Sequence, residues 1–118
     1  VAGDARVDGR TIPPAVVEGR CEIGDGAQIG PRVVLGDGVS VGDGTVVERA
    51  VVLQGARVGR DCVLRDCIVA AGARIGDRTQ VTGGAVLGEG VTIGADNVVT
   101  RGARIFPGVE IPDGGLKF

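Results

Sequence analysis

An aliphatic residue returns at almost every sixth position of this 118-residue chain, and no other feature constrains the fold as strongly. The period runs from Val17 to Ile111, with two steps of five near the middle. Its positions are Val17, Ile23, Ile29, Leu35, Val41, Val47, Val52, Val58, Leu64, Val69, Ile75, Val81, Leu87, Ile93, Val99, Ile105 and Ile111. A repeat this short predicts a solenoid, in which each unit buries its apolar side chains by stacking on its neighbours.

Two units are one residue shorter than the others, and their spacing indicates how many units make a coil. The shortened units run from Val47 to Val51 and from Leu64 to Ile68, 17 residues apart. Elsewhere three full units make 18 residues, so a deletion that recurs one turn later predicts three units per coil. The two deletions should therefore lie at the same corner of neighbouring coils.

The residue two positions before each repeat aliphatic should point inward with it, because side chains alternate along a strand. These residues are mostly small: Ala15, Cys21, Ala27, Val33, Val39, Thr45, Ala50, Ala56, Cys62, Cys67, Ala73, Thr79, Ala85, Val91, Asn97, Ala103, Val109 and Gly115. This agreement supports the register and places all three cysteines inside as packing residues. We expect Asn97, the one amide among them, to hydrogen-bond to neighbouring backbone.

The outward residues predict three faces of different character. One is polar and carries Glu22, Ser40, Arg57, Arg74, Thr92 and Glu110. A second mixes Val46, Val63 and Val98 with Gln28, Gln80, Glu48, Arg65, Thr82 and Thr100, and Glu48 should pair with Arg65 on the adjacent coil. The third is apolar, and its predicted interface residues are Val16, Val34, Val51, Leu53, Ile68, Val86 and Phe106, with Ala70 beside them. A continuous apolar column indicates an interaction surface, so we expect this face to pack against a second copy or a domain outside the chain.

The composition excludes several kinds of function. The chain has no histidine, which removes His-based acid–base catalysis and His-ligated metal sites. A formal net charge of −2 indicates no excess of basic residues for binding nucleic acid, and no apolar run approaches the length of a membrane span.

Three widely spaced cysteines argue against a disulfide framework or a zinc site and favour a reducing, cytoplasmic setting. Asp61, Asp66, Asp77 and Asp96 fall at corners, where Asp favours turns. We therefore predict no catalytic residue, metal ligand or cofactor site in this chain.

Units such as Ile23-Gly-Asp-Gly-Ala-Gln28 and Leu87-Gly-Glu-Gly-Val-Thr92 resemble the hexapeptide repeat. The resemblance covers residues 17–116 and implies an all-β fold, a left-handed parallel β-helix of about six triangular coils. We expect an irregular N-terminal cap or first coil at residues 1–16, where Pro13-Pro14 interrupts the period, and a C-terminal end at 117–118. The two enzyme classes best known on this fold, acyltransferases and β-helical carbonic anhydrases, use histidine, which is missing here.

The paired five-residue units and the ending Ile111-Pro-Asp-Gly-Gly-Leu-Lys-Phe118 are similar to the C-terminal β-helix of sugar-nucleotide pyrophosphorylases, especially mannose-1-phosphate guanylyltransferases. In that family a preceding α/β domain, with a G-G-x-G-T-R-L loop, converts NTP and a sugar 1-phosphate into NDP-sugar and pyrophosphate. No such loop occurs in this chain. The resemblance implies a noncatalytic structural and oligomerisation domain of such a nucleotidyltransferase, with Val1 at a cut point and a homo-oligomer or the absent N-terminal domain as partner. Two alternatives stay open: a stand-alone scaffold or protein-binding module, and a degenerate acyltransferase-like protein.

Overall fold

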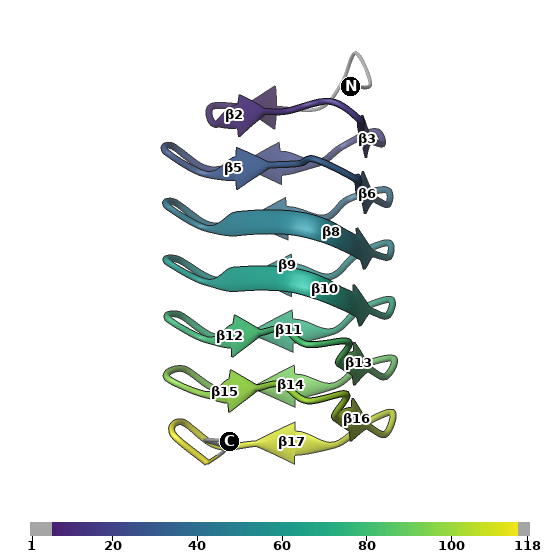
Figure 1. Cartoon of the computed structure of the whole chain (residues 1–118), viewed down its shortest axis with the longest axis vertical. Helices are drawn as coiled ribbons and strands as arrows, with labels where there is room; N and C mark the ends of the chain where they lie inside the picture. The colour runs from purple at the N-terminus through teal and green to yellow at the C-terminus, as the bar shows by residue number, and fades with distance from the viewer. Residues whose placement is uncertain (1–5, 116–118) are drawn as a thin grey trace.

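A computed structural model of the chain describes residues 6–115, which form a triangular prism of stacked β coils (Figure 1). The prism measures 37 × 22 × 20 Å. Each coil contributes a short strand to each of three faces before the chain moves one level along the axis. In Figure 1 the front strands run from left to right while the chain descends from its N-terminus, which makes the winding left-handed. The predicted fold, a left-handed parallel β-helix of about six coils, is confirmed.

The strands of the three faces pair only in parallel within the described residues. The polar face contains β1 (Arg6–Val7), β4 (Glu22–Ile23), β7 (Ser40–Val41), β9 (Arg57–Val58), β11 (Arg74–Ile75), β14 (Thr92–Ile93) and β17 (Glu110–Ile111). The mixed face contains β2 (Arg10–Thr11), β5 (Gln28–Ile29), β12 (Gln80–Val81) and β15 (Val98–Val99). The apolar face contains β3 (Ala15–Val17), β6 (Val33–Leu35), β13 (Val86–Leu87) and β16 (Arg104–Ile105). Two longer strands, β8 (Val46–Val52) and β10 (Val63–Val69), run from the mixed face onto the apolar face.

Strands β8 and β10 continue around a corner because the shortened units remove one residue there. Their ladder pairs Glu48 with Arg65 and Ala50 with Cys67, so the two deletions stack on each other. In the coil after β10 the same corner holds two glycines at positions 83 and 84, and pairing resumes on both sides of them. The predicted three units per coil and the common corner are confirmed.

The first coil is more regular than the sequence predicted. We expected an irregular cap over residues 1–16, but β1, β2 and β3 pair in register with β4, β5 and β6. The connection from β1 to β2 is two residues shorter than that from β4 to β5, and Thr11 occupies a position that is aliphatic in other coils. These two departures hide the period, while the bend at Pro13-Pro14 interrupts only one corner. The remaining cap residues 1–5 and the predicted C-terminal end at 117–118 lie outside the described residues.

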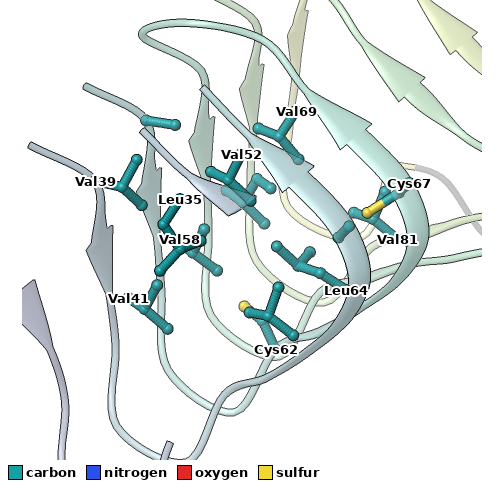
Figure 2. Packing of buried hydrophobic residues seen from close by; sticks show 14 of the residues in the cluster. Leu35, Val39, Val41, Val52, Val58, Cys62, Leu64, Cys67, Val69 and Val81 are labelled. Atoms are coloured by element: carbon teal, nitrogen blue, oxygen red, sulfur yellow. The ribbon is translucent and has the colours of Figure 1, made fainter. Parts of the chain in front are cut away.

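The core is one cluster of small and branched side chains, and Figure 2 shows part of it. Every repeat aliphatic from Val17 to Val99 is at most 4% exposed, and the residues two positions earlier, from Cys21 to Asn97, are also buried. The predicted inward register is confirmed over this range. Val109 departs from it, because it is 38% exposed in the last described coil, where no further described coil covers it.

Polar side chains inside the prism form a hydrogen-bond ladder near the corner between the polar and mixed faces. Thr45 Oγ1 donates to the carbonyl of Gly59 at 2.6 Å, and Thr79 Oγ1 donates to the carbonyl of Gly94 at 2.9 Å. Asn97 Nδ2 donates to three backbone carbonyls, which confirms its expected role. Among the described residues, no buried side-chain nitrogen or oxygen lacks a partner, so these groups tie each coil to the next without an unsatisfied polar atom.

Two glycines illustrate why this chain is rich in that residue. A Cβ on Gly42 would lie 2.5 Å from the carbonyl oxygen of Gly59, so the stacking of neighbouring coils excludes a side chain there. Gly55 has open space around it but a φ of 71°, which most side chains disfavour. The glycines thus serve close stacking in one case and turn conformation in the other.

The three cysteines are free and buried, as predicted from their inward register. Burial raises the pKa of the Cys21 and Cys62 thiols. Burial, with a smaller contribution from the Asp66 carboxylate, raises the pKa of Cys67 to about 12. Neutral thiols packed in this way act as small apolar side chains.

We predict that ionisation of these thiols destabilises the fold at alkaline pH. Below about pH 9, Cys67 is neutral in both the folded and the unfolded chain, whereas above it only the unfolded chain ionises, until the folded thiol titrates near pH 12. This group should therefore lower the free energy of unfolding by about 1.4 kcal/mol per pH unit over that window. Urea denaturation across this range should give a shallower pH dependence for Cys67→Ala than for the wild type, and equal slopes would contradict the prediction.

Candidate interaction face

The apolar face carries an unbroken column of aliphatic side chains, each in register with the next. Val16 pairs with Val34 and Val34 pairs with Val51. Val51 then pairs with Ile68, and Ile68 pairs with Val86. Paired strands lie about 4.8 Å apart, so these outward side chains follow one another as direct neighbours. We call this the first column, and it ends at Arg104, the partner of Val86.

The first column is partly open to solvent. Val16 is 50% exposed, Val34 is 39% exposed and Ile68 is 45% exposed. Val51 and Val86 are half-buried, so they present less surface than their outward positions suggested. Contiguous exposed apolar surface of this kind marks interaction sites more often than isolated apolar residues do.

A second column runs beside the first, two residues further along each coil. Its members are Glu18, Gly36, Leu53, Ala70, Gly88 and Phe106. Leu53 is 38% exposed and Phe106 is 75% exposed. They lie three coils apart, roughly 14 Å at the usual strand spacing, and Ala70 and Gly88 separate them. The structure thus brings five of the seven predicted interface residues into one column and places Leu53 and Phe106 in the other.

Charged side chains occur only at the two ends of these columns. Glu18 lies at the N-terminal end of the second column, and Arg104 lies at the C-terminal end of the first. Both are exposed. The apolar face therefore has opposite charges at its opposite ends, which the sequence prediction did not consider. The exposure of Val109, at the C-terminal end of the prism, was not predicted either, because the inward register of this residue predicted burial.

Ion pairs line both edges of the face. At the corner shared with the mixed face, the Arg49 guanidinium contacts both Asp66 carboxylate oxygens, at 2.8 and 3.3 Å. This hydrogen bonding holds the pKa of Asp66 below its usual range, and both side chains are exposed. At the corner shared with the polar face, Arg20 Nη2 lies 3.2 Å from Asp37 Oδ2.

The other predicted polar contacts are also found. Arg65 Nε lies 3.4 Å from Glu48 Oε2, which confirms the expected pair on adjacent coils. Asp66 and Asp96 occupy positive φ at corners, and the Asp77 carboxylate accepts the backbone N–H of Arg60. These carboxylates therefore serve turns and ion pairs between coils, in agreement with their predicted turn chemistry.

Two shallow grooves flank the apolar face. One, of about 360 Å³, lies along the corner with the mixed face, where Val51, Ile68 and Val86 meet the Arg49–Asp66 pair. The other, of about 760 Å³, lies at the corner with the polar face and includes Val34 and Leu53. Both are open to solvent along their length, so they extend the apolar surface rather than enclose a small ligand.

Neither a metal cluster nor a membrane-spanning helix occurs in the part of the chain that the structure describes. No three Cys, Asp or Glu side chains within residues 6–115 lie close enough together to hold a metal ion. No helix in that range is long and apolar enough to cross a bilayer. The exposed aliphatic column, in register over five coils, makes the apolar face the strongest candidate functional surface.

Comparison with known protein families identifies this arrangement of coils. Residues 11–114 match the GMPPB C-terminal domain. The chain belongs to this family. The resemblance to the C-terminal domain of sugar nucleotidyltransferases, inferred from the paired five-residue units, is thereby confirmed. No curated protein sequence matched the chain.

Solved structures similar to this GMPPB C-terminal domain include several hexapeptide-repeat acetyltransferases. PerB from Caulobacter crescentus, solved with CoA and GDP-perosamine, superposes with a TM-score of 0.85 at 30% identity, over 92% of this chain and 53% of PerB. The acetyltransferase domain of PglB from Neisseria gonorrhoeae gives 0.69 at 19% identity, over 96% and 55%. LpxA from Bacteroides fragilis, a UDP-N-acetylglucosamine acyltransferase, gives 0.51 at 14% identity, over 97% and 65%. The chain thus spans only about half of PerB, and the last two likenesses show the fold alone.

We predict that the Asp66 carboxyl titrates below an ordinary aspartate because of Arg49. Since its pKa is depressed in the folded state, the stabilisation by this pair is present above the unfolded pKa and is lost as the pH falls through the folded pKa. Carbon-13 NMR of the side-chain carboxyl should show the Asp66 pKa rising toward its usual range in Arg49→Gln. The matched control, Arg78→Gln, breaks the similar pair with Asp96 elsewhere and should leave Asp66 unchanged. An Asp66 titration that does not respond to Arg49→Gln would contradict the assignment.

Proposed function

We propose that this β-helix is a noncatalytic structural and oligomerisation domain of a sugar-1-phosphate nucleotidyltransferase, and that its apolar face is the contact surface. The observation that carries the proposal is the combination of membership in the GMPPB C-terminal domain family with an exposed apolar column along one of the three faces that residues 6–115 form. In the parent enzyme, a separate domain would convert NTP and a sugar 1-phosphate into NDP-sugar and pyrophosphate. The β-helix would hold that domain, or a second subunit, in place.

The energetics of the apolar face support a contact role. Full burial of a Val, Leu, Ile or Phe side chain is worth about 1.5–3 kcal/mol relative to full exposure. Val16, Ile68 and Phe106 retain about half or more of their surface in solvent, so a partner gains part of that energy by covering them. Hydrogen bonds between coils hold the backbone that carries these side chains, so little backbone entropy is lost on association.

Acyl transfer is the competing activity, because PerB, solved with CoA and GDP-perosamine, shares 30% identity with this chain. The resemblance to hexapeptide acyltransferases implies a catalytic histidine, and the sequence contains none. Asp66, Asp77 and Asp96 at the corners are engaged in turns or in ion pairs between coils. These observations favour the structural role over a degenerate acyltransferase.

We predict that nucleotidyltransferase activity requires more than this chain. The product of the complete reading frame that encodes it should release pyrophosphate from a nucleoside triphosphate and a sugar 1-phosphate, while the 118-residue chain alone should not. The coupled pyrophosphate assay should use several bases and sugars, because this domain does not determine their identity. A complete product that has no nucleotidyltransferase domain and releases no pyrophosphate would instead support the stand-alone scaffold.

We also predict that acidic substitutions on the apolar face weaken assembly. Val51→Asp combined with Ile68→Asp should lower the oligomeric mass of the complete product, because two adjacent charges would have to be desolvated on contact. The matched control, Arg57→Asp with Arg74→Asp, changes outward residues of the same two coils on the polar face and should leave the mass unchanged. Light scattering after size exclusion measures the mass, and circular dichroism verifies folding. An unchanged mass for a folded apolar-face variant would count against the contact surface.

A further inference from the structure

We propose that Arg57 and Arg74 form a binding site for a phosphate monoester on the polar face of the prism. These arginines belong to β9 and β11, which are neighbours in the seven-stranded sheet near the middle of the prism (Figure 1). The site lies on a different face from the proposed contact surface, so its test does not depend on the proposed function.

The two arginines break a charge rule that the rest of the described strands obey. Within residues 6–115, Arg57 and Arg74 are the only side chains of like charge that face each other in a strand ladder. Their strands lie about 4.8 Å apart, and both side chains are exposed. Like charges directly opposite each other on a sheet are destabilising, whereas the ladder between β8 and β10 sets Glu48 opposite Arg65. A local arrangement that lowers stability is typical of a functional site.

The protein does not neutralise this pair. Neither arginine forms an ion pair within the described part of the chain. The corner that precedes each strand is neutral, with Gln54 before β9 and Ala71 before β11. The corresponding corners of the coils on either side carry the carboxylates of Asp37 and Glu89. The two central coils therefore lack a carboxylate at the corner that leads into the arginines.

The carboxylate nearest in sequence to the pair already has a partner. Asp77 follows Arg74 by three residues, and its Oδ1 accepts the backbone N–H of Arg60 at 2.9 Å. Between this corner and the arginines lies a column of glycines that includes Gly59 and Gly76, both partly exposed. A Cβ on Gly59 would collide with Asp77 and with the backbone of the next coil. The absence of side chains from this column leaves room for a ligand beside the guanidinium groups.

Hydroxyl groups extend the row of donors at both ends of the arginine pair. Ser40 is the ladder partner of Arg57, and Thr92 is the ladder partner of Arg74. Both residues are partly exposed. The row of four side chains spans three strand spacings, about 14 Å. Hydroxyl donors next to two guanidinium groups suit an oxygen-rich anion.

A hollow of about 300 Å³ beside Arg57 provides space for the organic part of an ester. Its lining residues are Arg20, Glu22, Gly38, Val39, Ser40 and Arg57. Two of the charges in the lining already face opposite charges. Arg20 contacts Asp37 at 3.2 Å, and Glu22 faces Arg6 in the ladder. Arg57 is then the cation of the lining that remains available to an anion.

Charge and geometry favour a phosphate monoester over a carboxylate. One guanidinium fork satisfies both oxygens of a carboxylate, as Arg49 does with Asp66. A phosphate monoester has three free oxygens and a charge of about −1.5 to −2 at pH 7. It therefore matches two adjacent forks and their combined charge, and its binding would relieve the repulsion between Arg57 and Arg74.

Titrations followed by NMR of the arginine Nε–Hε groups test the site. With inorganic phosphate or glucose 1-phosphate added at constant ionic strength, the resonances of Arg57 and Arg74 should shift together and saturate, while that of Arg10 should stay in place. Arg10 is a suitable reference because it is exposed, has neutral Gln28 as its ladder partner and forms no ion pair in the described range. The two probes distinguish an ester from the free anion.

Charge-neutral variants test the two arginines separately. Arg57→Gln and Arg74→Gln should each raise the dissociation constant for glucose 1-phosphate about tenfold or more, because each removes charge-assisted hydrogen bonds. The matched control, Arg10→Gln, removes the same charge on the mixed face. It should change the constant by less than about twofold, since salt screens distant exposed charges. Circular dichroism verifies that the variants are folded.

Thermal unfolding separates a binding role from a structural one. Without phosphate, Arg57→Gln should melt at the same temperature as the wild type or higher, because it removes a contact between like charges. Glucose 1-phosphate should raise the melting temperature of the wild type but not that of the variant. A variant that melts below the wild type in phosphate-free buffer would assign the arginines to the fold instead.

The titrations can also overturn the site directly. Equal shifts at Arg10, Arg57 and Arg74 would indicate nonspecific attraction of anions. Acetate that binds as tightly as phosphate would identify the ligand as a carboxylate. Inorganic phosphate that binds while glucose 1-phosphate does not would exclude the monoester as ligand.

Discussion

Backbone hydrogen bonds between neighbouring coils hold this molecule together, and almost every other feature depends on their spacing. The N–H of Gly24 donates to Val41 at 2.8 Å, and the N–H of Gly42 donates to Val58 at the same distance, so each coil lies one strand spacing from the next. At that spacing only hydrogen fits beside the next coil at Gly42. The interior is equally narrow, so it accepts branched aliphatic residues alternating with small ones. The glycine content and the near absence of aromatic residues follow from the same constraint.

A six-residue period carries most of this information, and the fold could therefore be predicted from the sequence in unusual detail. The inward register located the three buried cysteines and the backbone-bonded amide of Asn97. The two five-residue units located the corner where β8 and β10 turn without a break. The regular strands of the first coil could not be predicted from the period. The shortened connection between β1 and β2, and Thr11 in a position that is aliphatic elsewhere, interrupt the six-residue repeat there. The exposure of Val109 could not be predicted from its inward register, because burial also requires a further coil that covers the side chain.

The candidate site was only partly predictable, for a related reason. The alternation of side chains along a strand identifies which residues point outward, so the apolar column could be predicted from the sequence. The solvent exposure of each outward residue depends on its neighbours. Val51 and Val86 are half-buried, whereas Phe106 is largely exposed to solvent. Arg49 and Asp66 both have positive φ at the corner where they pair, and the spacing of the aliphatic residues does not predict such local geometry. The functional proposal therefore depends on surface geometry as well as on family membership.

Among the three faces of the prism, the apolar face is the one to which we assign the contact function. Methyl NMR spectra of the 118-residue chain over a dilution series test this assignment, because the apolar and mixed faces both carry outward aliphatic residues whose methyl groups report on contact. We predict that the methyl resonances of Val34, Val51 and Ile68 shift with concentration, while those of Val46, Val63 and Val98 on the mixed face stay constant. Concentration-dependent shifts that are confined to the mixed face would contradict this assignment.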